Sequence, residues 1–534
     1  MSSATPVSLP ASRPEVNPWI VAVTVTLATF MEVLDTTIAN VSLPYIAGDL
    51  GVSLDEASWL LTTYLVANAV VLPASGWISG LIGRKRFYMG CVLLFTISSA
   101  LCGMAPNLPI LLLCRLFQGA GGGGLQPSEQ GILLDTFPRK KVGMAMAVYG
   151  IAVLFAPILG PTVGGYITEN YHWRWIFYIN IPVGCLSLAL TQLVVRDPDY
   201  MVAERRAQHG KPLNLDLFGL TLITLGLGAL EVIYDRGQED DWFNSRAILV
   251  LTVLAVVALS TAVIWELRHP KPVINLRLLK DRNFGIGCLL VYVIFFALYG
   301  SNVLLPQMVQ VLFGYDAYTA GLIMSPAGIV VMICMPVSGY LLGRGVDARR
   351  LMFFGILCVA AGSYWQALLS LDASPGILVM RRCAQLFAMG FIFAPANVAA
   401  YLYLPQEQTS NATGLFNMVR NEGASLGIAT VNIMLAQRGQ LHQTRLVEGL
   451  GPLGEAFVTA RDQLTQQFQM AGYDPVTAGQ MALDQIYQAT QQQALLMSYL
   501  DLFFLFAVAT CCIAPLVFLM RRSVAGKGVE IHRH

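Results

Sequence analysis

Long apolar runs alternate with short polar segments along almost the whole chain. About 20 consecutive apolar residues are enough for a helix to cross the hydrocarbon core of a bilayer. Fourteen runs of this kind are predicted, at 19–44, 57–80, 87–105, 108–130, 142–168, 176–195, 214–234, 247–267, 284–311, 318–342, 351–370, 378–403, 411–436 and 495–520. The pattern therefore predicts an all-α polytopic membrane protein embedded in a lipid bilayer.

Lys and Arg residues collect on one side of these predicted helices. Most of the 33 basic residues lie in the first segment, in loops after even-numbered helices and in the tail. The opposite loops hold Arg174, Arg236, Arg246, Arg438, Arg445 and Arg461. Because cytoplasmic loops are enriched in Lys and Arg, both termini are predicted to be cytoplasmic. The segment up to Asn17 is short and polar, which favours a cytoplasmic lead over a cleaved signal.

Composition agrees with this reading. The 534 residues are 55% hydrophobic and 12% charged, whereas soluble domains are roughly 45–50% apolar and about 25% charged. The net charge is +1 and the basic residues are dispersed, so nothing indicates nucleic-acid binding. The ten cysteines fall within apolar runs and form no disulfide framework or metal-spaced cluster. We expect no metal and no cofactor.

One carboxylate interrupts the first apolar run. Asp35 lies near the middle of 19–47, and Glu32 precedes it by one helical turn. An ionised Asp at the centre of a spanning helix costs about 2.5–3.5 kcal/mol on insertion scales. Such residues usually face a bundle interior or a water-filled cavity and mark a proton or ion pathway. The first helix therefore predicts coupled transport.

Arg115 is a permanent charge within the fourth predicted helix and needs a partner. Asp35, Glu32 and Glu129 are the candidates. A carboxylate beside this arginine binds or releases a proton when a conformational change alters its burial or its distance from the arginine. The alternative is a static ion pair between two helices. Glu32 and Asp35, three residues apart, either share one proton or leave Glu32 facing water.

The fifth predicted helix is rich in proline and glycine. It contains Pro157, Gly160, Pro161, Gly164 and Gly165. Prolines remove backbone donors and glycines permit close helix approach, so we expect a bent, tightly packed helix. This helix serves as a gate, serves only to pack closely against its neighbours, or does both. The glycines at 121–124 similarly predict either close packing or room for a substrate.

A weak internal repeat divides the chain. The segment 73–86, with Arg84 near its end, is echoed at 336–350, and repeated halves around a midplane site are common in transporters. The predicted organisation is a lead at 1–17, a six-helix bundle at 18–196, a linker at 197–213, two inserted helices at 214–268, a six-helix bundle at 284–520 that includes a loop at 437–493, and a tail at 521–534.

The loop at 437–493 is long and rich in glutamine. Asp474 followed by Pro475 is typical of an N-cap with proline in the first turn, so a helix is predicted from there towards the last span. A structured hairpin would form a docking surface. The alternative is a disordered loop that covers the outer face.

A drug-binding cavity should be apolar and aromatic with a few polar groups. Glu422, close to Arg420, is predicted either to take part in gating or substrate contact or to belong to a structural Arg-Glu pair. The candidate cavity residues are Trp59, Tyr64, Gln118, Glu129, Phe296, Tyr299, Gln307, Arg420 and Glu422.

Four separated motifs resemble those of one transporter family. They are the strings at 34–44, 111–119, 156–165 and 173–182. With these four motifs in this order, the chain is similar to the fourteen-helix drug:proton antiporters of the major facilitator superfamily, the EmrB/QacA type. It is most similar to the EmrB branch of that type. The resemblance implies two six-helix bundles plus two inserted helices, with Asp35, Glu32 and Arg115 coupling protons and the 156–165 string acting as a gate. The family's loop motif carries an Asp where this chain has Gly80, which puts the usual interface lock in doubt and leaves Arg84 as a topology anchor.

The resemblance implies proton-driven export of hydrophobic or amphipathic toxic compounds across the bacterial inner membrane, with the proton gradient as the energy source. It also implies a periplasmic, EmrA-like membrane-fusion adaptor that docks on the 437–493 hairpin and leads to an outer-membrane channel. The runner-up is a dedicated exporter of one natural compound, such as a fatty acid, a siderophore or a metabolite of the host. An enzyme is disfavoured because no catalytic set is present, and a channel because no filter-like segment repeats.

Overall fold

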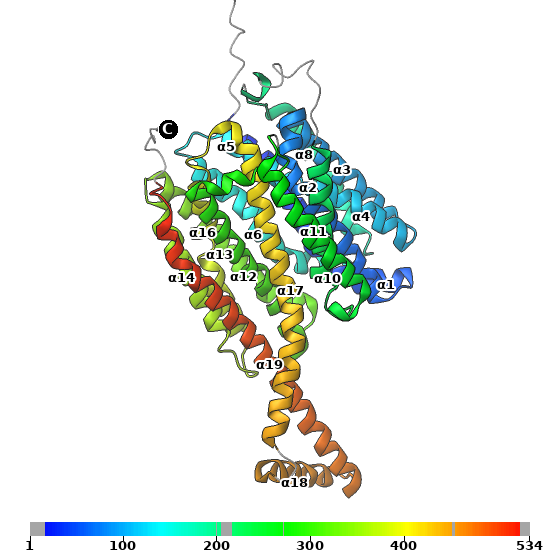
Figure 1. The fold of residues 1–534 in the computed structure, drawn as a ribbon. Helices are drawn as coiled ribbons and strands as arrows, with labels where there is room; N and C mark the ends of the chain where they lie inside the picture. Colours follow the sequence, from blue (N-terminus) through cyan, green and yellow to red (C-terminus); the bar gives the residue numbers. More distant parts are fainter. Residues whose placement is uncertain (1–16, 199, 204–215, 271, 451–453, 524–534) are drawn as a thin grey trace, which may run out of the picture.

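The computed structural model describes residues 17–198, 200–203, 216–270, 272–450 and 454–523, and these residues form a bundle of helices (Figure 1). The first part contains α1 (Pro18–Leu50), α2 (Leu54–Ile82), α3 (Arg84–Met104), α4 (Leu108–Gly122), α5 (Leu125–Thr136), α6 (Val142–Asn170), α7 (Trp175–Tyr178) and α8 (Asn180–Val194). The remainder contains α10 (Leu217–Arg236), α11 (Arg246–Arg268), α12 (Arg282–Phe313), α13 (Ala317–Gly343), α14 (Ala348–Gln366), α15 (Pro375–Phe387), α16 (Gly390–Tyr401), α17 (Thr409–Leu450), α18 (Glu455–Met470) and α19 (Pro475–Ile513).

The all-α membrane fold predicted from the apolar runs is confirmed. Within the described residues, twelve helices are long and apolar enough to cross a membrane, counting α4 with α5, α7 with α8 and α15 with α16 as single spans. The predicted spans 351–370 and 411–436 correspond to α14 and α17, which are not among these twelve. Both nevertheless pack among the spanning helices, α14 against α19 and α17 against α12 and α2. The count of fourteen stays a prediction.

Local sequence signals explain where several helices begin. Asn17 accepts a hydrogen bond from the backbone of Trp19 ahead of α1, and Ser53 and Glu56 form a capping box at the start of α2. The Asp474 carboxylate accepts hydrogen bonds from two backbone amides in the first turn of α19. A hydrogen bond from the Thr477 side chain and these backbone bonds stabilise the carboxylate, so the pKa of Asp474 is lowered. The predicted helix start at Pro475 is confirmed.

Two predicted spans are interrupted in the middle. The span at 108–130 is divided between α4 and α5 at Gly123 and Gly124, and α5 continues to Thr136. The span at 378–403 is divided between α15 and α16 around Ala388 and Met389. A Cβ atom on Gly124 would lie 2.4 Å from the Cys91 sulfur, so the first break occurs where α3 crosses closely.

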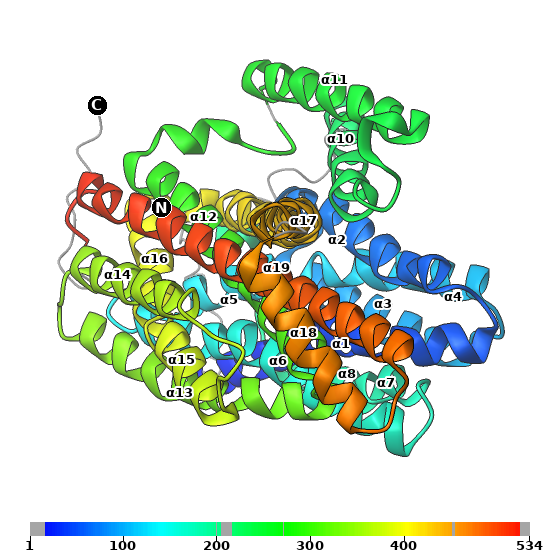
Figure 2. The ribbon, with the colours of Figure 1, turned by 90° about the horizontal axis from the view of Figure 1, so that it is seen from below.

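Helices α1–α8 pack around one another, as do α12–α17 and α19, and the two groups meet along two seams. Helix α6 packs against α13, and α2 packs against α17. Helices α10 and α11 form a hairpin whose first helix contacts α2 and α17, and they lie at the edge of the bundle when it is viewed along the helices (Figure 2). The inserted pair is therefore placed against both groups rather than between them.

Helix α17 continues beyond the bundle and, with α18 and α19, forms a projecting helical hairpin (Figure 1). We call this side of the molecule the hairpin face. The opposite side, where α1 begins and where Ser523 lies, is the terminal face. Most of the described part of 437–493 is helical, which favours the structured hairpin over a disordered cover loop. The predicted lead at 1–16, most of the linker at 197–213 and the tail from 524 lie outside the described residues.

Candidate functional site

Asp35 and Arg115 form a buried ion pair between α1 and α4. The Arg115 Nη1 atom donates to Asp35 Oδ2 at 2.6 Å, and the two residues are 0% and 2% exposed, respectively. Of the three carboxylates considered as partners for the arginine, the structure selects Asp35. The guanidinium also lies over the Tyr64 ring, 4.5 Å from its centroid. A buried pair of this kind is costly to break, because either partner alone leaves an uncompensated charge.

Neutral side chains complete the surroundings of the Asp35 carboxylate. Its Oδ1 atom accepts hydrogen bonds from Asn180 at 2.6 Å and from Gln118 at 3.0 Å. Gln118 also accepts from Arg115 at 2.9 Å. Asp35 therefore connects α1 with α4 and α8. Sequence reasoning assigned Gln118 to the substrate cavity and missed Asn180, although Asn180 belongs to the 173–182 motif.

Glu32 has a separate set of partners. Its Oε1 atom accepts from the Tyr64 hydroxyl at 3.2 Å and from Asn68 at 3.4 Å, and its Oε2 atom accepts from Gln126 at 2.7 Å. Glu32 is 4% exposed, so it does not face bulk water in this conformation. The two carboxylates on one helix face are each held by different donors, which supports two distinct sites rather than one shared hydrogen bond.

Arg420 connects the Glu32 site to the second group of helices. From α17 it donates to Gln126, the same side chain that donates to Glu32, and to the Tyr149 hydroxyl at 2.8 Å. Its guanidinium lies over the Phe295 ring at 5.3 Å from the centroid. A route of polar contacts therefore runs from a carboxylate of α1 through α5 to α17, across the interface between the two groups.

Glu129 lies on α5, near the same route. Its Oε1 atom accepts from Thr26 of α1 at 2.6 Å, while Oε2 is buried without a hydrogen-bond partner among the described residues. The next residue, Gln130, contacts Asn397 and accepts from Asn417 at 2.6 Å. Glu129 is fully buried, so α5 places a third buried carboxylate beside the interface.

Two of the remaining cavity candidates, Tyr299 and Phe296, are neighbours of Phe295 on α12, and only one of them lies beside the Arg420 contact. Tyr299 stacks on Phe295, the ring beneath the Arg420 guanidinium, with 5.8 Å between centroids. Phe296 instead packs edge-on against Phe506 of α19, at 5.4 Å. Only Tyr299 of this pair is thus placed beside the polar route, and Phe296 serves the packing of α12 on α19.

The other candidates lie apart from this cluster. Gln307 has a buried Oε1 atom without a hydrogen-bond partner in the described part of the chain. Trp59 is 37% exposed and lies under Arg236 at the outer end of α10. Glu422 lies on α17, which contacts the inserted helix α10, and its Oε2 atom is buried without a hydrogen-bond partner among the described residues, while Arg420 donates to Gln126 and Tyr149.

The glycines of α6 set how closely this helix approaches α1. A Cβ atom on Gly160 would lie 2.0 Å from Thr37 Oγ1, and one on Gly164 would lie 3.2 Å from Ile38 Cα. A Cβ atom on Gly165 would meet nothing within 4 Å. Pro157 and Pro161 lie inside the same continuous helix. The glycines at 160 and 164 therefore hold α6 closely against α1 just after Asp35, and Gly165 takes no part in that contact.

The glycines after Arg115 also serve close packing. A Cβ atom on Gly119 would lie 2.3 Å from the Tyr64 carbonyl oxygen, and one on Gly123 would lie 2.6 Å from the Asn68 carbonyl oxygen. Backbone atoms of α2 fill the space, so this surface leaves no room for a substrate. Of the two possibilities left by the sequence, close helix approach is the one observed.

Arg84 does more than anchor topology. It is 2% exposed, forms an ion pair with Asp135 of α5 and donates to Ser410 of α17 at 2.6 Å. A Cβ atom on Gly76 would lie 2.4 Å from the Ser410 carbonyl oxygen, so α2 and α17 touch here. Asp135 thus pairs with Arg84 within the first group of helices although position 80 is glycine, and Arg84 contacts the second group through Ser410.

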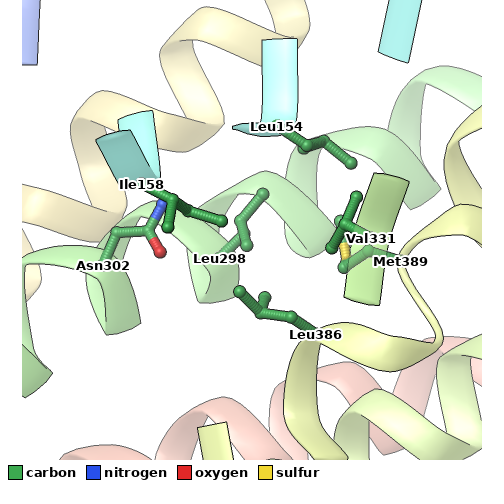
Figure 3. A pocket seen from close by; sticks show the side chains of 7 residues that line it. All are labelled: Leu154, Ile158, Leu298, Asn302, Val331, Leu386 and Met389. Carbon is green, nitrogen blue, oxygen red and sulfur yellow. The ribbon is translucent and has the colours of Figure 1, made fainter. Parts of the chain in front are cut away.

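Two hollows lie between the groups of helices. The larger, about 460 Å³, is at the terminal face and is lined by the ends of α5, α6 and α16, including Phe137, Tyr401 and Thr409. The smaller lies deeper, between α6, α12, α13 and α15, and has no room for a water molecule in this conformation (Figure 3). Six of its seven lining side chains are apolar, and the seventh is Asn302.

Comparisons with known proteins agree with this architecture. The model of the Major Facilitator Superfamily matches residues 25–428. The chain is 38% identical over 437 residues to the multidrug export protein EmrB of Escherichia coli K12, covering 81% of this chain and 83% of the relative. It is 34% identical to the fatty acid resistance protein FarB of Neisseria gonorrhoeae, covering 93% and 94%. The solved structure of the proton:xylose symporter XylE shares the fold, with a TM-score of 0.54, 14% identity and coverage of 92% and 94%.

Proposed function

Because this chain belongs to the major facilitator superfamily and, within it, to the family of the EmrB multidrug export proteins, we propose that it exports hydrophobic or amphipathic toxic compounds in exchange for protons. The resemblance drawn from the four motifs is thereby confirmed. The chain is a multi-pass membrane protein of the multidrug-efflux type, and its family and fold are those of transporters rather than enzymes.

The observation that carries the proton exchange is the buried pair of Asp35 and Arg115. A proton that binds Asp35 removes the charge that compensates Arg115, and this weakens the connection between α1, α4 and α8. Helix α1 then moves relative to its neighbours more readily. Release of the proton restores the pair. Protonation and the position of α1 are thus linked, which is what an antiporter requires.

The route from Glu32 through Gln126 to Arg420 carries this change to the other group of helices. Alternating access requires the interface between the groups to open on one side and close on the other. Gln126 contacts both a carboxylate of α1 and an arginine of α17. A change at Glu32 therefore alters a contact that holds the interface, and the proton gradient, with no further cofactor, supplies the energy.

The proposal is tested in vesicles that hold this protein and a preset proton gradient. A panel of lipophilic cations, amphipathic acids and uncharged drugs is added one compound at a time, and loss of the gradient is recorded. We expect several chemically unrelated compounds to discharge it. If no compound does so while the protein is folded and inserted, proton-coupled export is refuted.

A dedicated exporter of one natural compound is the second candidate. The 34% identity to a protein named for fatty acid resistance favours a fatty acid as that compound. The same panel separates the two candidates, since a dedicated exporter responds to a single chemical class. Discharge by one class alone would support this second candidate over multidrug efflux.

We also propose that the protein works in the bacterial inner membrane, with cytoplasmic termini, as the pump of a tripartite system. The helical hairpin of α17, α18 and α19 supports this, because it projects on the side opposite the start of α1 (Figure 1). A periplasmic, EmrA-like membrane-fusion adaptor would dock there and lead to an outer-membrane channel. Deletion of 445–490 should abolish co-purification of such an adaptor. Unchanged recovery would refute docking on the hairpin.

A further inference from the structure

Arg382 is buried in the carboxy-terminal group of helices without a charged partner among the described residues. Arg382 of α15 is 0% exposed. Its Nη1 atom donates to Gln385 Oε1 at 2.6 Å and to Ser301 Oγ at 3.1 Å, and Nη2 donates to Asn302. All three acceptors are neutral, and Nε is buried without a partner among the described residues. Buried charges are normally paired, so this cation lacks its expected counterion.

The surroundings of Arg382 repeat those of Arg115 apart from the carboxylate. Each arginine lies two turns into a helix that breaks soon afterwards, and each donates to a glutamine three residues further on. Arg115 also contacts Asp35. In the part of the chain that the structure describes, no Asp or Glu side chain forms an ion pair with Arg382. The Arg382 guanidinium is therefore surrounded by neutral acceptors, and its positive charge is not balanced by an anion among the described residues.

A further group at the site has unused hydrogen-bonding capacity. Gln366 of α14 is 0% exposed, and neither its amide nitrogen nor its amide oxygen has a hydrogen-bond partner among the described residues. It lies one turn beyond Ser363, which accepts from Gln385 at 3.0 Å. Buried polar groups of proteins are normally satisfied. Arg382 and Gln366 thus leave donors for a ligand that this structure does not contain.

An apolar gap borders the same site. Asn302, which accepts a hydrogen bond from Arg382, also lines the smaller hollow, together with Leu298 of the same helix and Leu386 of α15 (Figure 3). Leu154 and Ile158 of α6 close it from the other group of helices. Ligand pockets usually occupy roughly 300–1,000 Å³, whereas this hollow has no room for a water molecule, so a ligand could enter it only after the surrounding helices move apart. Because it lies between the two groups, their separation during transport enlarges it.

We propose that Arg382 binds the carboxylate of amphipathic organic acids, and that the hollow between α6, α12, α13 and α15 receives their hydrocarbon chain. This inference names a substrate class and rests on the proposed export function. A buried guanidinium recognises a carboxylate through paired charge-assisted hydrogen bonds, and an apolar wall beside it favours a long chain over a small hydrophilic anion.

The test compares two probes, dodecanoate and tetraphenylphosphonium, for binding to the purified full chain and for export by vesicles. Arg382→Gln should weaken dodecanoate binding by about tenfold or more, because a charge-assisted hydrogen bond is lost. Export of tetraphenylphosphonium should persist. Arg381→Gln is the matched control, since the Arg381 side chain contacts the Trp365 carbonyl oxygen instead, and it should leave dodecanoate binding unchanged.

Asn302→Asp keeps the arginine and tests the same idea without removing it. The new carboxylate would neutralise Arg382 as Asp35 neutralises Arg115. We expect it to stabilise the fold and to reduce dodecanoate binding as strongly as Arg382→Gln does. Unaltered dodecanoate binding in this variant would overturn the proposal even if Arg382→Gln fails to fold.

The outcomes separate this inference from the export function. If wild-type vesicles export neither probe in exchange for protons, the export function fails, while specific dodecanoate binding by the purified chain would still support the site. If tetraphenylphosphonium is exported and the Arg382 and Asn302 variants bind dodecanoate as the wild type does, the inference alone is overturned. Displacement of dodecanoate by an equal concentration of chloride would assign a simple inorganic anion and would also overturn it.

Discussion

The two groups of helices each bury an arginine at a similar place in a broken helix, and they treat its charge in opposite ways. Arg115 is paired with Asp35, whereas Arg382 contacts only neutral acceptors among the described residues. A paired charge can be switched by a proton, since the carboxylate is titratable. An unpaired charge cannot be switched in this way, but it attracts an anion. This contrast underlies our proposal that one half couples to protons and the other selects cargo.

Asp35→Asn should have the largest effect, because it removes the only titratable member of the Asp35–Arg115 pair. We expect transport driven by a pH gradient to be abolished while the protein stays inserted. The measurement is uptake of tetraphenylphosphonium into inverted vesicles under an imposed pH gradient, with protein amount determined by immunoblot. Full gradient-driven transport by this variant would refute the assignment of the proton site and remove the contrast between the halves.

Arg115→Met and Arg382→Met should differ in stability. The first leaves the buried Asp35 carboxylate without its cation, and breaking a buried pair costs about 3–5 kcal/mol. The second leaves only neutral hydrogen-bonding groups unpaired, which costs about 1–3 kcal/mol. Thermal unfolding in detergent should therefore show a greater fall in Tm for Arg115→Met. An equal or greater fall for Arg382→Met would mean that its neutral site holds the fold as strongly as the ion pair does.

Gly160→Ala should disturb the closure around the proton site, and Gly165→Ala provides the matched control. A Cβ atom at 160 would lie 2.0 Å from Thr37 Oγ1, two residues after Asp35, whereas one at 165 meets nothing within 4 Å. Overpacking of this kind costs about 1–3 kcal/mol. We expect faster passive proton leak through vesicles that hold Gly160→Ala, measured with a pH-sensitive dye. Equal leak from both variants would show that this contact does not seal the pathway.

Gln118→Leu and Gln385→Leu test the equivalent glutamines and should have the smallest effects. Gln118 contacts both members of the ion pair, so its loss should slow proton-coupled transport by about tenfold, the equivalent of one hydrogen bond to a charged group. Gln385 contacts Arg382, so its loss should alter dodecanoate export and leave tetraphenylphosphonium export intact. Identical effects of the two substitutions on both probes would contradict the division of roles.

The sequence predicted the spans and the residues of the N-terminal ion pair because both leave strong local signals. Apolar length identifies a span, and a charge within such a span stands out from its neighbours. The choice of Asp35 rather than Glu32 or Glu129 for Arg115 could not be read from spacing, since it depends on how α1, α4 and α5 are rotated. Asn180 and Gln126 were missed because neutral amides carry no comparable signal in a sequence.

The carboxy-terminal site was harder to find for a related reason. Arg382 adjoins Arg381 near the start of a predicted span, where long basic side chains commonly extend towards the membrane surface. Its burial follows from the packing of α15 against α13 and α14, which sequence patterns do not reveal. The helix breaks after Arg115 and Arg382 were also missed. The first is indicated by consecutive glycines, but the second, around Ala388 and Met389, has no such mark.

The most direct test of proton coupling is the release of protons when a substrate binds. Tetraphenylphosphonium is added to purified protein in weakly buffered detergent solution that contains a pH-sensitive dye. We predict that the wild type releases protons and that Asp35→Asn releases none. Glu32→Gln should release fewer protons than the wild type only if Glu32 shares the exchanged proton with Asp35. Equal proton release by Asp35→Asn and the wild type would contradict the claim that Asp35 carries the exchanged proton.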